Sequence, residues 1–151
     1  MTPALAAGPA VDEDALAFVA PGMSSQDVAS LVCGNAGERS AYLGHVRQRY
    51  PLLPPREQLR AVLLKGEELK PSPEAAGLSA ATYAGPLIPI VGRALIQAAK
   101  RYGPAVFNSL RSAVRRGYGA FNDWVRRHAF AAVVMAGVAG NAVYDWLRAH
   151  L

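Results

Sequence analysis

The chain is poor in the residues that carry chemistry in small proteins. Its 151 residues include one cysteine, Cys33, and three scattered histidines. A single thiol excludes an intramolecular disulfide framework and leaves too few thiol ligands for a structural zinc site. The sequence also lacks an HExxH, P-loop or CxxC motif. We therefore expect no metal and no other cofactor.

No group of residues predicts a catalytic centre. Cys33 and His45 could act as nucleophile and base only if the fold brought them together by chance, so a buried structural thiol is the favoured interpretation. The neighbouring acids at 12–14 and 67–68 would point in different directions on a helix, which favours a solvated face over an acid/base pair. We predict that the protein is not an enzyme and has no catalytic residues.

Acidic residues are scarce in the second half of the chain. Residues 1–80 carry nine acids and seven Lys or Arg, whereas residues 81–151 carry two acids and nine Lys or Arg. The two halves therefore have formal charges of −2 and +7, which sum to the +5 of the whole chain. Such an excess of positive charge suits an anionic partner, either phospholipid, nucleic acid or an acidic protein face.

The N-terminus lacks the basic leader and apolar run of a cleaved signal peptide, because acids occupy residues 12–14. Conventional secretion is therefore disfavoured, and a location at a membrane or within a particle stays open. With 52% hydrophobic and 18% charged residues, the chain is rich enough in apolar groups to build a core.

The hydrophobic periodicity predicts an all-α protein. We expect a small N-terminal bundle of short helices, followed by long basic amphipathic and apolar C-terminal helices. The expected divisions are a loose arm (1–10), a small helical region (11–70), a linker rich in proline and glycine (71–86) and a basic, apolar helical region (87–151).

Local signals place the helices of the first half. The four expected elements are a short helix opened by the acids at 12–14 and stopped by Pro21-Gly22, a helix from Ser24 or Ser25 to a C-cap at Gly34-Asn35, a helix over about 38–50, and a helix opened by Pro54 and Pro55 that weakens at Gly66.

Two amphipathic helices are predicted in the second half. Residues 87–102 form the first, with a basic end at Lys100 and Arg101, and Gly103-Pro104 ends it. In the next helix, apolar residues from Phe107 to Val125 recur at steps of three and four and share a stripe about 60° wide. The glycines on either side of Tyr118 predict a kink there. Arg115-Arg116 and Arg126-Arg127 lie eleven residues apart in the sequence, so an unbroken helix would place both pairs on one face.

Residues 129–144 form a run with no charge and one polar side chain, Asn141. A helix of this length covers about 24 Å, which is short of the ~30 Å hydrocarbon core, although extension to Trp124 and Trp146 gives about 33 Å. A central core helix and a membrane segment are equally compatible with the run. Ala132, Ala136 and Gly140 recur every four positions, a spacing that lets helices pack closely.

The leading functional hypothesis is a non-enzymatic protein whose C-terminal half associates with or perturbs membranes, after oligomerisation or release. In general layout residues 85–151 resemble membrane-perturbing helical segments of toxins and of non-enveloped viral capsid interiors, without a diagnostic motif. The residues expected to contact lipid or partner helices are Phe107, Leu110, Val114, Phe121, Trp124, Val125 and Trp146. The residues expected to contact phosphates are Lys100, Arg101, Arg115, Arg116, Arg126 and Arg127.

The alternative hypothesis is a structural or assembly protein of a particle that binds nucleic acid through its arginine pairs. Tyr102, Tyr118 or Trp124 could then stack on unpaired bases. A third hypothesis, compatible with both, is an all-α adaptor in which residues 1–80 cover the apolar half. Each hypothesis predicts a homo-oligomer or a place in a larger assembly.

Overall fold

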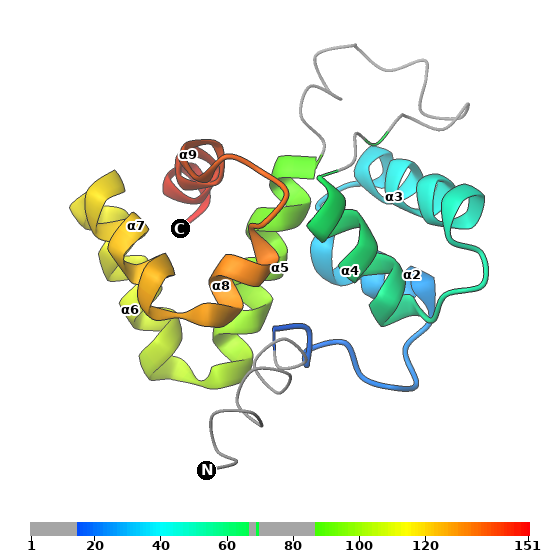
Figure 1. The fold of residues 1–151 in the computed structure, drawn as a ribbon, viewed down its shortest axis with the longest axis horizontal. Helices are drawn as coiled ribbons and strands as arrows, with labels where there is room; N and C mark the ends of the chain where they lie inside the picture. The colour runs from blue at the N-terminus through cyan, green and yellow to red at the C-terminus, as the bar shows by residue number, and fades with distance from the viewer. Residues whose placement is uncertain (1–14, 67–68, 70–86) are drawn as a thin grey trace.

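The computed structural model describes residues 15–66, 69 and 87–151 and is all-helical, as predicted (Figure 1). The predicted arm and linker lie outside these residues. The helices formed within the described ranges are α2 (Ser25–Val32), α3 (Ala36–Arg49), α4 (Pro55–Lys65), α5 (Leu87–Tyr102), α6 (Pro104–Arg116), α7 (Tyr118–Arg127), α8 (Ala129–Val134) and α9 (Gly140–His150).

Helix α5 is the centre of the fold. Figure 1 shows α2, α3 and α4 on one side of it and α6 to α9 on the other, and α5 packs directly against α2, α6, α8 and α9. Such a position requires an apolar surface on more than one side of the helix. The buried residues of α5 that provide this surface are Leu87, Ile90, Val91, Gly92, Ala94, Leu95, Ala98 and Ala99.

The first-half helices begin and end mostly where the sequence predicts. Ser24 caps α2 in a capping box with Asp27, and α4 has Pro55 in its first turn and a left-handed Gly66 (φ 60°) at its end. One prediction was wrong: Asn35 does not end α2. Its side chain accepts a 2.8 Å hydrogen bond from the Glu38 N–H and so caps the start of α3.

The short helix predicted after the acids at 12–14 is tested only in part. Residues 15–18 form a turn, closed by a hydrogen bond from the Val19 N–H to the Leu16 carbonyl. The earlier residues of that prediction lie outside the described ranges.

The predicted kink near Tyr118 is a complete helix break. Gly117 adopts φ 122°, which only glycine reaches without strain, and it separates α6 from α7. The two helices pack against each other, and Trp124 of α7 donates a 2.8 Å hydrogen bond to Ser109 of α6. Residues 104–127 therefore form a helical hairpin, so the shared face predicted for the two arginine pairs does not exist.

The uncharged run at 129–144 is also not one helix. The six residues of α8 end at Val134, and residues 135–139 connect it to α9. Within the described ranges, no helix has the length and apolar character that crossing a membrane requires. Both interpretations of the run assumed a continuous helix, and both are wrong in that respect.

Glycines bring the two sides of the molecule close together. Gly92 of α5 lies against the Trp146 ring of α9, and a Cβ added at Gly92 would overlap that ring. Gly66, at the end of α4, and Gly137, after α8, similarly bring their backbones into direct contact. Larger residues at these points would hold the helices apart.

We expect Gly92→Ala to destabilise the fold by about 1–3 kcal/mol, because the new methyl group overpacks the α5–α9 contact. Gly44→Ala is the matched control: Gly44 lies within α3 with nothing near its added Cβ, so the same substitution should stabilise by up to ~1 kcal/mol. Urea unfolding followed by circular dichroism measures both changes. Equal stabilisation by the two variants would contradict the close α5–α9 contact.

Candidate anion-binding surface

The structure separates the two sets of site residues that the sequence predicts. The six cations are all exposed, whereas the seven apolar residues are buried or half-buried. Leu110, Val114, Phe121 and Trp124 are at most 2% exposed, and Phe107, Val125 and Trp146 are half-buried. The cationic set is therefore open to a partner, and the apolar set forms or borders the core.

The outer face of α6 carries a shallow polar hollow. It has a volume of about 360 Å³ and is lined by Asn108, Arg111, Ser112, Arg115 and Arg116. Guanidinium groups bind phosphate oxygens in bidentate geometry, and hydroxyl and amide side chains add hydrogen bonds to them. We call these five residues the α6 basic face.

Phe107 orients two of the neighbouring cations. The Lys100 Nζ lies 5.3 Å from the centre of its ring, and the Arg111 Cζ lies 5.9 Å from it. These cation–π contacts hold both charges against α6. The basic end of α5 thereby continues into the α6 basic face.

The composition around this face leaves its charge largely unopposed. Residues 87–122 contain six Lys or Arg and no acid. One of the six, Arg93, is paired with Glu38, which leaves five cations at or near α6. The last-turn position of Arg115 and Arg116 also stabilises α6 through its dipole, so these residues have a structural role besides any contact with a ligand.

Arg126 and Arg127 lie at the opposite end of the α6–α7 hairpin from Arg115 and Arg116. Their helix runs antiparallel to α6, as the Trp124–Ser109 hydrogen bond requires. Arg126 forms an ion pair with Asp123, which reduces its charge toward a partner. Trp124 stacks on His128 with ring centres 4.2 Å apart, so its indole is a packing group and is not available to a base.

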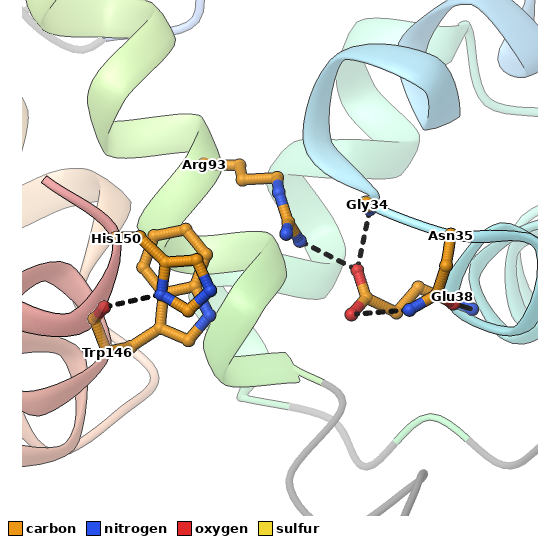
Figure 2. Close-up of polar contacts among 6 residues, drawn as sticks. All are labelled: Gly34, Asn35, Glu38, Arg93, Trp146 and His150. Carbon is orange, nitrogen blue, oxygen red and sulfur yellow. Dashed lines mark hydrogen bonds and ion pairs between the residues drawn. The ribbon is translucent and has the colours of Figure 1, made fainter.

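Trp146 belongs to a contact between the two sides of the molecule (Figure 2). Arg93 reaches from α5 to Glu38 with a 2.8 Å ion pair, and its Cζ lies 5.0 Å from the centre of the Trp146 ring. Glu38 also accepts a 2.7 Å hydrogen bond from the Gly34 N–H. On α9, the His150 ring stacks on the Trp146 ring. The Trp146 indole, which the sequence predicted to contact lipid or a partner helix, therefore takes part in the packing of the fold.

The three small residues predicted to pack helices together do not lie on one helix. Ala132 is exposed on α8, Ala136 is exposed in the connection, and Gly140 begins α9. At Gly140, an added Cβ would lie 3.2 Å from the Tyr118 hydroxyl. Their spacing of four is therefore not a packing motif in this fold.

Sequence reasoning missed three members of the α6 basic face, Asn108, Arg111 and Ser112. The signal that could have found them is the absence of acids from 87 to 122, combined with a helical register that places these residues opposite Leu110 and Val114.

Cys33 has the properties of a structural thiol. It is 5% exposed, and burial, aided by the Glu38 carboxylate, raises its pKa from the ordinary 9.0 to about 12. Burial also raises the pKa of Tyr42. Among the described residues, no group of three or more His, Cys, Asp or Glu side chains is placed to hold a metal ion.

The comparisons with known proteins give no further guide to function. No family model matches this sequence, and no curated protein or solved structure is significantly similar to it. The functional argument therefore depends on the geometry of this chain.

We expect Cys33 to react slowly with a disulfide reagent at about pH 8, because a pKa of about 12 lowers its thiolate fraction roughly a thousandfold below that of a thiol with pKa 9.0. Stopped-flow measurements of the reaction rate in the folded state and in urea give the ratio of the two rates, and the urea-unfolded chain is the control. Comparable rates in the two states would show that the thiol is accessible and ionised in the fold.

Proposed function

We propose that this protein is a non-enzymatic helical binding protein that holds nucleic acid by its phosphates, as a structural or assembly component of a larger particle. One observation carries the proposal: the cations predicted to contact phosphates are exposed, whereas the apolar stripe from Phe107 to Val125 is buried or half-buried. Contacts to phosphates provide affinity without sequence specificity, which suits a component that neutralises and organises a polyanion.

The α6 basic face is the centre of the proposed interface. Its three arginines meet no acid on α6, and Asn108 and Ser112 add neutral hydrogen-bonding groups between them. Lys100 and Arg101 extend the positive surface from the end of α5. Arg126 and Arg127 would add longer-range attraction, reduced by Asp123.

Association with an anionic membrane is the second candidate. It is supported by the connections at Gly103 and Gly117, single residues with positive φ and nothing close to an added Cβ. A hairpin joined in this way could turn its buried apolar side toward lipid after a trigger. The same exposed cations would make the first contact with the headgroups.

The expected homo-oligomer also remains a proposal. Leu52 is 95% exposed in the connection between α3 and α4, which makes it an accessible apolar group for a second chain. Size-exclusion chromatography with light scattering measures the assembly state directly.

We expect the double variant Arg115→Gln/Arg116→Gln to weaken binding to a single-stranded oligonucleotide and to lower the magnitude of the log–log salt slope by about 1.4, because two phosphate contacts are lost and each contributes ~0.7 for a single strand. Fluorescence anisotropy between about 50 and 200 mM salt measures this slope.

The matched control is Arg47→Gln/Arg49→Gln, which removes the same charge from the exposed last turn of α3. Its slope should stay close to that of the wild type. Equal losses in the two variants would indicate attraction by net charge alone. Flotation with anionic vesicles but no binding of the oligonucleotide would favour the membrane candidate.

A further inference from the structure

The outer side of α6 carries one row of exposed residues. They follow one another at steps of three, four and three, so at 100° per residue they lie within about 80° of one another around the helix axis. The residues of this row are Ala105, Asn108, Ser112 and Arg115. The buried residues Leu110, Ala113 and Val114 occupy the opposite side of the helix. The row therefore faces away from the core.

Cations lie on both flanks of this row. Arg111 and Arg116 are five residues apart, so they leave the helix about 140° apart, one on each side of the row. Lys100 joins Arg111 on its flank, because both cations contact the Phe107 ring. Small and hydrogen-bonding side chains thus occupy most of the middle, and positive charge borders them on two sides.

The α6 basic face is not recessed between helices. All five residues that line its hollow come from α6, so no other described helix forms a wall around it. The sequence of α6 contains no acid, and Asp123 of the neighbouring α7 is ion-paired with Arg126. A large polyanion can therefore approach α6 without meeting an acid on that helix.

We infer that the nucleic acid bound by this protein is double-stranded DNA and that the exposed side of α6 lies in its major groove. This groove is about 12 Å wide and admits one α-helix, whose diameter with side chains is about 10–12 Å. Phosphates border the groove on both sides and base edges form its floor, which matches the flanking cations and the row between them. The inference rests on the proposed function, to which it adds the form of the nucleic acid.

The side chains of the row suit contacts with base edges. In the major groove an arginine such as Arg115 can pair with guanine O6 and N7, and an asparagine such as Asn108 with adenine N6 and N7. Ser112 can bond to either base, and the Ala105 methyl group suits the methyl group of thymine. Residues 105–115 span about 15 Å, which covers about four base pairs at 3.4 Å each.

This geometry selects duplex DNA over other nucleic acids. A single strand has no groove bordered by two backbones, and the major groove of an RNA duplex is too narrow and deep for side chains to read. Phosphate contacts alone would not distinguish the DNA and RNA duplexes in this way, because both carry the same number of phosphates.

The test compares four probes in fluorescence anisotropy: a DNA duplex of about 12 base pairs, its single strand, the RNA duplex of the same sequence, and the same DNA duplex with glucosylated 5-hydroxymethylcytosine. The glucose groups fill the major groove and leave the phosphates unchanged. We expect the unmodified DNA duplex to bind at least about tenfold more tightly than each of the other three.

The double variant Asn108→Ala/Ser112→Ala tests the row itself. It changes no charge, and alanine favours the helix, so the fold should be retained. We expect binding of the DNA duplex to weaken by about five- to fiftyfold, with the salt slope and the binding of the RNA duplex unchanged.

Gln26→Ala/Ser30→Ala is the matched control, because it removes an exposed amide and an exposed serine four residues apart in α2. It should bind the DNA duplex as the wild type does. An equal loss of all four probes in the α6 variant would indicate a structural effect and contradict the role given to the row.

A footprint with the unaltered protein gives an independent measurement. Dimethyl sulfate methylates guanine N7 in the major groove and adenine N3 in the minor groove. The bound protein should protect guanine N7 and leave adenine N3 reactive. Protection of adenine N3 alone, or of neither atom at saturating protein, would overturn the inference.

The outcomes also separate this inference from the proposed function. Equal affinity for the unmodified DNA, glucosylated DNA and RNA duplexes, or tighter binding of the single strand, would overturn the groove inference and leave phosphate binding in place. Failure to bind any of the four probes at low salt would overturn both. Binding of phosphatidylserine vesicles alone would also overturn both and move the same cations to the membrane candidate.

Discussion

The packing of α5 against helices on both of its sides is the constraint on which the rest of the structure depends. This helix is buried along most of its length, and Gly92 lets α9 approach closely through the Trp146 ring. Because α2 covers one side and α6, α8 and α9 cover the other, α5 joins the acidic and basic halves of the chain into one hydrophobic core. The Arg93–Glu38 ion pair is the polar counterpart of this junction (Figure 2).

Burial of apolar groups by α5 decides which face of the basic half remains available. Amphipathic helices orient their apolar side toward the nearest apolar surface, and for α6 that surface is provided by α5, α7 and α9. Leu110 and Val114 therefore point inward, and Arg115 is left outside with Asn108 and Ser112. The same packing that buries the predicted lipid contacts thus creates the α6 basic face. A helix whose apolar side is buried and whose exposed side is cationic favours a partner recognised by charge and hydrogen bonds.

The predictable parts of this fold are those set by residues close together in sequence. Ser24, Gly66 and Gly103-Pro104 act through their own backbone or through a bond three residues away, and each ends or begins a helix as expected. The break at Gly117 was underestimated because hydrophobic periodicity continues across it. Each helix of a hairpin buries its own apolar side. The apolar residues from Phe107 to Val125 therefore show the same sequence periodicity whether they belong to one bent helix or to two antiparallel helices. The α6 basic face depends on that reversal and on packing against α5, which periodicity does not encode.

The energetics of the buried stripe bear on the choice between the two candidate partners. Exposing Leu110, Val114 and Phe121 would remove roughly 5 to 9 kcal/mol of hydrophobic stabilisation, at about 1.5–3 kcal/mol for each side chain. That loss is comparable to the whole stability of a typical domain, about 5–15 kcal/mol. Lipid insertion of the stripe would therefore require the basic half to unfold in large part and recover the loss in the bilayer. Docking of phosphates on Arg111, Arg115 and Arg116 requires no such rearrangement, because these groups already lie on the surface hollow of α6. The folded state is thus suited to binding a polyanion at its surface, and membrane entry would need a separate trigger that opens the core.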